Sequence, residues 1–210
     1  MLVMAKAPVP GRVKTRLCPP CDPVEAAGLA EAALADTLEA VAWCGASRRL
    51  LALDGQPGDW LPPGFTVFRQ SGSSFGERLA RAWARAGGPG LQIGMDTPQV
   101  TGPLLDGLLG RMACGSRSTL LGPAEDGGWW ALGLPVADPE VFRGVPMSTG
   151  TTGARQRRRL QELGYAVEEV ETLRDVDSIE DARAVAAVAP ESRFAAALQG
   201  LRLESGAGRA

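Results

Sequence analysis

Histidine is absent from this chain of 210 residues. Its absence excludes Ser-His-Asp triads, zinc sites of the HExxH type and imidazole general bases. Two phosphate-binding motifs are also missing, because the sequence has no GxxxxGK[ST] and no GxGxxG after its first apolar segment. Any chemistry must therefore use carboxylates, lysine, tyrosine or a bound metal, and a phosphate site must be built without a glycine cradle.

Cysteine is scarce as well. The four cysteines, Cys18, Cys21, Cys44 and Cys114, do not make a disulfide scaffold in a chain of this size. Cys18 and Cys21 form a lone CPPC. Because there is no second CxxC and no histidine, a four-ligand zinc site is not expected. A thioredoxin-like role is disfavoured because the pair follows a basic loop and does not open a helix directly after a strand.

Long apolar runs and a strong excess of charge are also missing. No apolar run approaches the roughly 18 residues that a membrane span needs, and the N-terminus lacks the pattern of a signal peptide. The net charge of −2 gives no general affinity for nucleic acid or anionic membranes, so any anion binding must be local. We therefore expect a cytoplasmic protein without nucleic-acid or membrane partners. The oligomeric state is left open.

What the sequence does contain is an alternation of strand-like and helix-like segments. We expect strands at residues 2–5, 49–53, 65–68, 91–95, 119–121, 129–134 and 165–170, and helices at residues 23–43, 75–86, 101–112, 153–163, 178–188 and 191–201. This order predicts one α/β domain, with a mainly parallel sheet and helices on both faces. An antiparallel insertion is expected around the turn AEDGG. The domain is expected to cover residues 1–190, with a C-terminal helix and a disordered tail in 191–210.

Four cations lie in one loop directly after the first expected strand. The segment KAPVPGRVKTRL contains Lys6, Arg12, Lys14 and Arg16, with Thr15 between two of them. Cations gathered in a small volume repel one another unless a polyanion lies among them. Ligands of open α/β sheets bind beyond the carboxyl ends of the strands, where this loop lies. The loop is therefore a candidate phosphate site with its cations at the surface, and a solvated basic loop is the alternative.

Two acidic segments are expected at the same edge of the sheet. Asp96 follows an apolar strand in IGMDTP, and Asp175 and Asp177 precede a late helix in LRDVDSIED. Mg²⁺ is commonly bound by one or two carboxylates together with phosphate oxygens and water. Asp96 and Asp177 are therefore candidate ligands of Mg²⁺ or Mn²⁺, with Asp175 as the alternative to Asp177. Each of them could instead cap a helix or stabilise a turn.

The turn AEDGG adds another acidic group. Glu125 and Asp126 precede Gly127 and Gly128, and the two glycines would let a ligand approach the backbone closely. A hairpin turn accounts for the same residues without a ligand. We interpret Asp126 as a carboxylate that faces the sugar or the acceptor, with Glu125 as the second candidate.

These segments, in this order, resemble one known family. The resemblance covers residues 2–188 and is carried by KAPVPGRVKTRL, SFGERL, IGMDTP, LGPAEDGGWWALGL, MST and DVDSIEDA. They are similar to bacterial glycosyltransferase-A-type proteins of the domain-of-unknown-function 2064 family, whose members are often named arsenosugar-biosynthesis glycosyltransferases and which are relatives of nucleotidylyltransferases. The resemblance implies a nucleotide-diphospho-sugar transferase fold in which Asp96 and Asp177 hold the metal on the nucleotide phosphates. It also adds Glu77 and Arg78 to the substrate-binding residues.

Two segments depart from the family pattern. Ser73 and Ser74 stand where relatives commonly carry Gly-Asp, and Met147 stands where relatives carry Trp before Ser-Thr. Both departures lie where an acceptor or a sugar would be recognised. The resemblance therefore does not transfer the identity of the substrate.

Three functions fit these residues. The first is metal-dependent transfer of a sugar from a nucleotide-diphosphate sugar to a small-molecule acceptor, with Asp96 and Asp126 as the catalytic carboxylates. The second is nucleotidylyl transfer, in which a phosphorylated acceptor attacks a nucleoside triphosphate and pyrophosphate leaves. The third is a nucleotide-binding module without catalysis. The released product separates the two enzymes, because the first releases a nucleoside diphosphate and the second pyrophosphate.

Overall fold

The computed structural model describes residues 1–113 and 118–201. Cys114 lies outside these residues, and so does the tail expected at the C-terminus. Within the described residues the elements are β1 (Leu2–Lys6), η1 (Thr15–Leu17), α1 (Pro23–Trp43), β2 (Leu50–Asp54), β3 (Thr66–Arg69), α2 (Phe75–Ala86), β4 (Gly90–Ile93), α3 (Gly102–Ala113), β5 (Ser118–Pro123), β6 (Trp129–Leu134), η2 (Pro139–Phe142), α4 (Thr152–Glu162), β7 (Ala166–Glu169), α5 (Ile179–Val188) and α6 (Arg193–Gly200), where η1 and η2 are short 3₁₀ helices. The helices expected at residues 23–43 and 75–86 have these bounds in the structure.

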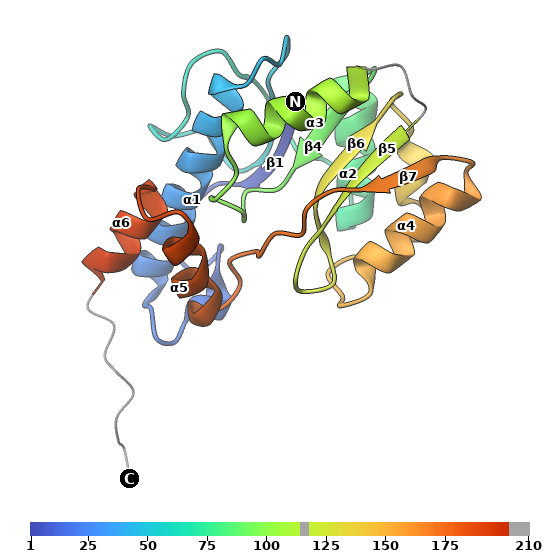
Figure 1. Ribbon diagram of the computed structural model, residues 1–210. Coiled ribbons are helices and arrows are strands. Elements are labelled where there is room, and N and C mark those ends of the chain that lie inside the picture. The colour runs from blue at the N-terminus through green and yellow to red at the C-terminus, as the bar shows by residue number, and fades with distance from the viewer. Residues whose placement is uncertain (114–117, 202–210) are drawn as a thin grey trace.

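The described strands form one sheet in the order β3-β2-β1-β4-β6-β5-β7 (Figure 1). β1 is parallel to β2 and β4, and β2 is parallel to β3. β6 is antiparallel to β4 and to β5, and β7 is parallel to β5. The predicted α/β class is therefore confirmed, and so is the antiparallel insertion around AEDGG.

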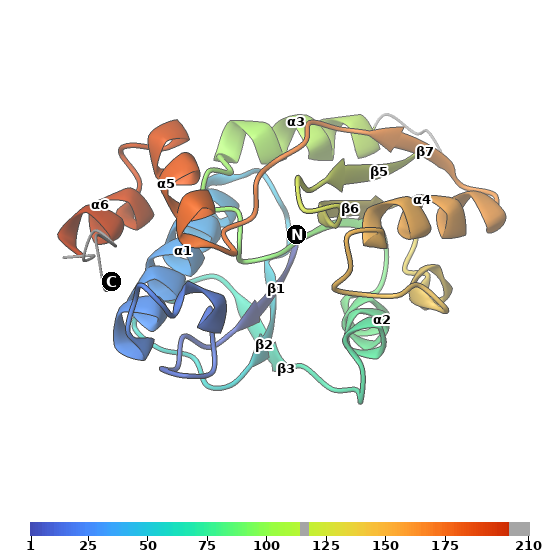
Figure 2. The ribbon, with the colours of Figure 1, turned by 90° about the horizontal axis from the view of Figure 1, so that it is seen from below.

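Successive residues of β1 alternate between two cores. Val3 and Ala5 pack in a cluster with buried side chains of α1 and α3, whereas Leu2 and Met4 pack with those of α2 and α4. Figure 2 shows the two pairs of helices on opposite faces of the sheet. Because both faces are covered, β1 is a continuous apolar run.

The starts of the helices follow capping residues that are visible in the sequence. The Asp22 carboxylate accepts hydrogen bonds from the backbone N–H groups of Val24 and Glu25 at 2.7 and 2.8 Å, and the Glu25 side chain accepts one from the N–H of Asp22. Ser178 and Asp181 form the same reciprocal arrangement at the start of α5. These caps explain why both starts could be predicted.

A third apolar cluster joins distant parts of the chain. Leu17 of η1 is fully buried in one cluster with Val176, with Ile179 of α5 and with Phe194 of α6, against the outer side of α1. Burial of a side chain of this kind contributes about 1.5–3 kcal/mol. This packing places the basic loop beside the segment that contains Asp175 and Asp177, some 160 residues later in the chain.

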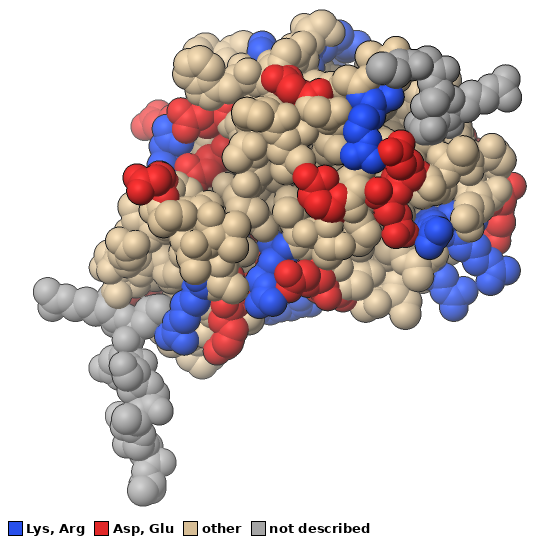
Figure 3. All heavy atoms as spheres, viewed as in Figure 1, with Lys and Arg blue, Asp and Glu red and all other residues tan. Residues whose placement is uncertain are grey.

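Charges on the face seen in Figure 3 are interspersed, with acidic and basic side chains side by side. This pattern agrees with the expectation that any anion site is local. Among the described helices, none is long and apolar enough to cross a membrane. Cys18, Cys21 and Cys44 are free thiols.

Candidate functional site

A cavity of about 660 Å³ lies at the carboxyl ends of β1 and β4. After β1 the chain continues to β2 and β3 on one side, and it then returns to β4 on the other side of β1. Such a reversal opens a crevice between two loops, and ligands of α/β sheets bind in it. Lys6 ends β1 and Asp96 follows β4, and both residues line the cavity. The cavity is therefore where the fold itself predicts a ligand.

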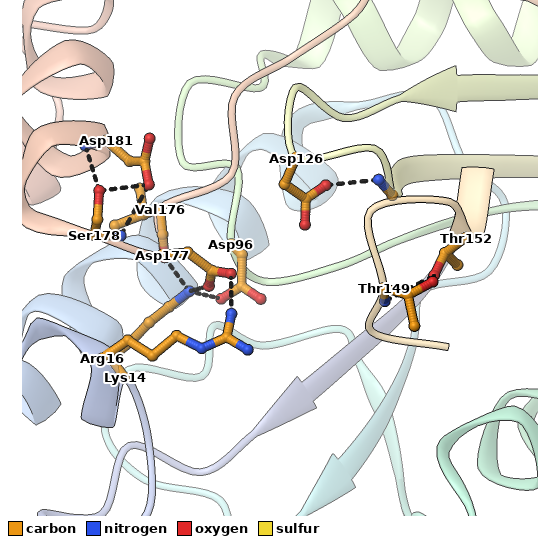
Figure 4. A network of polar contacts seen from close by, with 11 residues as sticks. Lys14, Arg16, Asp96, Asp126, Thr149, Thr152, Val176, Asp177, Ser178 and Asp181 are labelled. Atoms are coloured by element: carbon orange, nitrogen blue, oxygen red, sulfur yellow. Dashed lines mark hydrogen bonds and ion pairs between the residues drawn. The ribbon is translucent and has the colours of Figure 1, made fainter. Parts of the chain in front are cut away.

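Lys14 lies between two of the candidate carboxylates (Figure 4). Its Nζ is 2.6 Å from Asp96 Oδ1 and 3.5 Å from Asp177 Oδ1, and it donates a hydrogen bond to the carbonyl oxygen of Val176. Only 7% of the Lys14 side chain is exposed, so the expectation that it lies at the surface is wrong. Burial lowers the pKa of Lys14, but the neighbouring carboxylates, Asp96 above all, outweigh it and raise this pKa. Lys14 is therefore charged, and it holds Asp96 and Asp177 together.

The other residues of the basic loop divide between the cavity and the surface. Lys6 and Arg16 line the cavity, and Arg16 Nη1 is 2.7 Å from Asp177 Oδ2. Arg12 and Thr15 are exposed and are not among the lining residues. The structure therefore corrects the expectation of four converging cations: two face the cavity, and Lys14 is neutralised by carboxylates.

Neither Asp96 nor Asp177 caps a helix. The Thr101 hydroxyl accepts the hydrogen bond from Leu104 N–H at the start of α3, and Ser178 caps α5. The carboxylates of Asp96 and Asp177 pair instead with the loop cations, and both residues line the cavity. This geometry favours a role in the site over the capping alternative.

Asp175 belongs to the same group of carboxylates. It lines the cavity, and its Oδ1 is buried without a hydrogen-bond partner among the described residues. Burial, followed by repulsion from Asp96 and Asp126, raises the pKa of Asp175 from 3.8 to about 7, although the charge of Lys14 opposes the shift. A buried oxygen without a partner is a group that a cation or a hydrogen-bond donor would satisfy.

Residues of the AEDGG turn form both a hairpin and part of the cavity wall. Asp126 Oδ1 accepts a hydrogen bond from Gly128 N–H at 2.7 Å, so the hairpin interpretation accounts for one of its oxygens (Figure 4). Asp126 and Gly128 still line the cavity. Glu125 does not, because it forms an ion pair of 2.5 Å with Arg174. The structure therefore keeps Asp126 as a candidate and corrects the expectation for Glu125.

The space left by the missing side chain of Gly127 is taken by the backbone of Gly150, and not by a ligand as expected. Its φ of +85° lies in the left-handed region, and an added Cβ would collide with the carbonyl oxygen of Gly150. The Gly127 carbonyl accepts a hydrogen bond from Gly153 N–H at 2.8 Å. Gly127 therefore fixes the turn against the start of α4.

We expect Gly127→Ala to lower the free energy of unfolding by about 2 kcal/mol or more, because the left-handed conformation alone costs alanine about 1–2 kcal/mol. Gly11→Ala is the matched control, since Gly11 has a φ of +73° and open space around its Cβ position. Urea denaturation of both variants measures the difference. Equal losses would show that the approach of Gly150 does not matter for stability.

Glu77 and Arg78 lie on α2, between two cavities. Glu77 lines a second cavity of about 650 Å³, and hydrogen bonds from Ser73 hold the pKa of its carboxyl at about 2. Arg78 lines the first cavity, with its guanidinium 5.5 Å from the centre of the Phe75 ring. Phe75, Met147 and Ser148 line both cavities. The expected substrate residues of α2 are thus divided between two adjoining spaces.

The sequence profile of the family described as "Uncharacterized protein conserved in bacteria (DUF2064)" matches residues 28–149. This chain belongs to the DUF2064 family. The resemblance noted in the sequence is thereby confirmed. No curated protein matches the sequence.

Solved structures share the fold of this DUF2064 protein. A protein from Desulfovibrio desulfuricans G20, provisionally named a nucleotide-diphospho-sugar transferase, is 23% identical with a TM-score of 0.84, over 94% of this chain and 93% of that chain. A cytidylyltransferase from Leptospira borgpetersenii is 14% identical with a TM-score of 0.54, over 94% and 91%. The 2-C-methyl-D-erythritol 4-phosphate cytidylyltransferase from Thermus thermophilus is 18% identical with a TM-score of 0.51, over 90% and 100%. These likenesses show the nucleotide-diphospho-sugar transferase fold.

Sequence reasoning missed several residues that line the cavity of the DUF2064 protein. Asp54 ends β2, and Gln70 follows β3 and donates hydrogen bonds to the carbonyl oxygens of Ala5 and Ala52 at 2.8 and 2.9 Å. Trp129, whose Nε1 is buried without a partner among the described residues, forms part of the wall. The carboxyl ends of β2 and β3 were the signal that could have pointed to Asp54 and Gln70.

The carboxylates of the DUF2064 protein suit a hard divalent cation. The carboxylates of Asp96 and Asp177 reach toward the same position, and Asp175, whose Oδ1 is buried without a partner among the described residues, lines the same cavity. Among residues 1–113 and 118–201, no three acidic or cysteine side chains converge into a complete metal site. Mg²⁺ commonly takes only one or two carboxylates and completes its shell with phosphate oxygens and water. The residues present therefore fit a divalent cation whose remaining ligands are phosphate oxygens or water.

Proposed function

We propose that this DUF2064 protein is a metal-dependent glycosyltransferase that takes a nucleotide-diphosphate sugar as donor and a small molecule as acceptor. The observation that carries the proposal is the pairing of Asp96 and Asp177 around one cation position, beside Lys6 and Arg16, at the reversal of strand order. Carboxylates for a metal and cations for phosphates are what a metal-bound diphosphate needs. The fold shared with a provisionally named nucleotide-diphospho-sugar transferase supports the donor class.

The basic residues would act on the leaving group. When the bond between the sugar and the diphosphate breaks, negative charge grows on the phosphate oxygens, and groups aimed at that charge lower the barrier. Lys6 and Arg16 would bind these oxygens from the β1 side of the cavity. Asp96 and Asp177 would hold Mg²⁺ or Mn²⁺. When bound, the metal supplies positive charge to the diphosphate.

Asp126 would act on the acceptor. One of its oxygens is fixed by Gly128 N–H, which orients the carboxylate at the cavity wall. The other oxygen would accept a hydrogen bond from an acceptor hydroxyl and take up its proton as the new sugar–oxygen bond forms. The adjoining cavity behind Phe75 and Met147 offers room for the remainder of the acceptor.

The test is the identity of the released product. The protein is incubated with Mg²⁺ or Mn²⁺ and a panel of nucleotide sugars with hydroxyl acceptors, and in parallel with nucleoside triphosphates and sugar phosphates. We expect a nucleoside diphosphate, released from a nucleotide sugar. Pyrophosphate released from a triphosphate would overturn the proposal in favour of nucleotidylyl transfer. Nucleotide binding without turnover over both panels would favour the binding module.

A narrower prediction concerns Lys6. Lys6→Met should weaken binding of a Mg²⁺–nucleoside diphosphate about 10-fold or more, because a hydrogen bond to a charged group contributes about 1.5–3 kcal/mol. The fold should be unaffected, since the Lys6 side chain is exposed. Arg12→Gln is the control within the same loop, because Arg12 does not line the cavity. Titration calorimetry measures both affinities, and equal losses would show that the whole loop acts only through its net charge.

A further inference from the structure

The position between Asp96 and Asp177 is already held by a cation of the chain itself. Lys14 Nζ lies within ion-pair distance of both carboxylates, so the ammonium stands where a divalent cation would have to bind them (Figure 4). Two cations on the same carboxylate oxygens repel each other strongly at close range. A metal that binds between Asp96 Oδ1 and Asp177 Oδ1 would therefore displace the ammonium of Lys14.

We propose that Lys14 is a positioning residue that exchanges with the divalent cation. In the protein without nucleotide, Lys14 holds Asp96 and Asp177 in the arrangement that the metal needs. When the metal enters with a diphosphate, the ammonium moves onto the phosphate oxygens. This inference rests on the proposed function only in requiring that the ligand carry a diphosphate.

The exposure of the three side chains fits such an exchange. Lys14 is 7% exposed, whereas the side chains of Asp96 and Asp177 are 41% and 37% exposed. A cation arriving from the cavity therefore meets exposed oxygens of both carboxylates first, and it reaches the position between Asp96 Oδ1 and Asp177 Oδ1 only as the buried ammonium withdraws. A buried structural ion pair that the ligand never reaches would instead have both partners covered.

The loop also allows the ammonium to move. Lysine is a compact charge on a flexible stem of four carbons, so a small rotation of the side chain carries the ammonium several ångströms. Leu17, which is fully buried, anchors the loop close behind Lys14. Lys6 and Arg16 line the neighbouring part of the cavity, so phosphate oxygens bound there lie within reach of the same loop.

The first measurement is binding of Mn²⁺ alone, followed by electron paramagnetic resonance. Lys14→Met keeps most of the length of the side chain and removes its charge. The variant should bind Mn²⁺ at least 10-fold more tightly than the unmodified protein. Arg85→Met is the matched control, because it removes one positive charge in the last turn of α2. That turn leads into the amino end of β4, whereas the cavity lies at the carboxyl end. Its Mn²⁺ affinity should change less than 2-fold. Adding Asp96→Asn to Lys14→Met should abolish the gain.

The second measurement needs no variant. Lys6 and Lys14 are the two lysines of the chain, so selective ¹⁵N-lysine labelling reports on two ammonium groups by nuclear magnetic resonance. Addition of Mg²⁺ and pyrophosphate should shift both signals, Lys6 because it binds phosphate and Lys14 because it changes partners. A Lys14 signal that stays unchanged while the Lys6 signal shifts would overturn the exchange. So would equal Mn²⁺ affinities of Lys14→Met and the unmodified protein. If neither lysine responds, the proposed nucleotide function fails, and the Mn²⁺ comparison still decides the exchange.

Discussion

Asp96→Asn is expected to weaken binding of a metal–nucleotide complex at least about 100-fold. Loss of a partner in the outer shell of a metal site already costs 10–100-fold, so loss of a ligand should cost at least the upper end of that range. Turnover should fall with it, because the charge on the leaving diphosphate would no longer be neutralised. Titration calorimetry with Mg²⁺ or Mn²⁺ present and absent measures the binding, and product release measures turnover.

Asp177→Asn should have a similar effect, and the double variant should be scarcely worse than either single one, because residues that act as a unit are strongly non-additive. Both substitutions also remove a partner of Lys14, so thermal unfolding must show that each variant is folded at the temperature of the assay. Glu168→Gln is the matched control, since it breaks the surface ion pair with Arg111, in the last turn of α3. Metal-dependent binding that survives in Asp96→Asn would contradict the two-carboxylate site.

The fold could be read from the sequence because its signals are local. The start of α1 is marked by residues close together in the chain, Asp22, Pro23 and Glu25. The apolar run of β1 can be recognised as a strand without knowledge of its neighbours in the sheet. The order of strands and helices then leaves few topologies, since parallel strands need crossover connections. Strand β6 has the predicted bounds, whereas each other strand differs from the prediction by one or two residues at one or both ends, because pairing with neighbours decides where a strand stops.

The site could be predicted only as a set of residue types at one edge of the sheet. Asp96, Asp177 and Lys6 were expected there because the carboxyl ends of parallel strands meet. The burial of Lys14 could not be predicted, because it depends on Leu17 and Val176 packing in one cluster across most of the chain. The pairing of Glu125 with Arg174 and the approach of Gly150 to Gly127 are likewise tertiary contacts without a local signal.

Asp175 should make the metal-free protein less stable as the pH rises toward 7. Its pKa is raised to about 7 in the folded protein, mainly by burial, against an ordinary value of 3.8. The folded state therefore binds the proton more tightly than the unfolded state, and stability falls as the pH rises toward 7. At 1.36 kcal/mol per pKa unit, the loss between pH 5.5 and pH 8 is about 2 kcal/mol.

The variant Asp175→Asn isolates this contribution. The chain has no histidine, and the amino group of Met1, whose pKa burial lowers from 8.0, changes stability in the opposite direction. Urea denaturation in the presence of a chelator, at pH 5.5 and pH 8, should therefore show a decline in the unmodified protein that Asp175→Asn removes or reverses. At pH 8 the variant should be more stable by about 2–4 kcal/mol, because a neutral amide replaces a buried charge that Asp96 and Asp126 repel. Mg²⁺ with a bound nucleotide should shrink the difference, since a cation beside Asp175 favours its ionised form. Parallel stability curves for the two proteins would contradict a raised pKa of the Asp175 carboxyl in the folded protein.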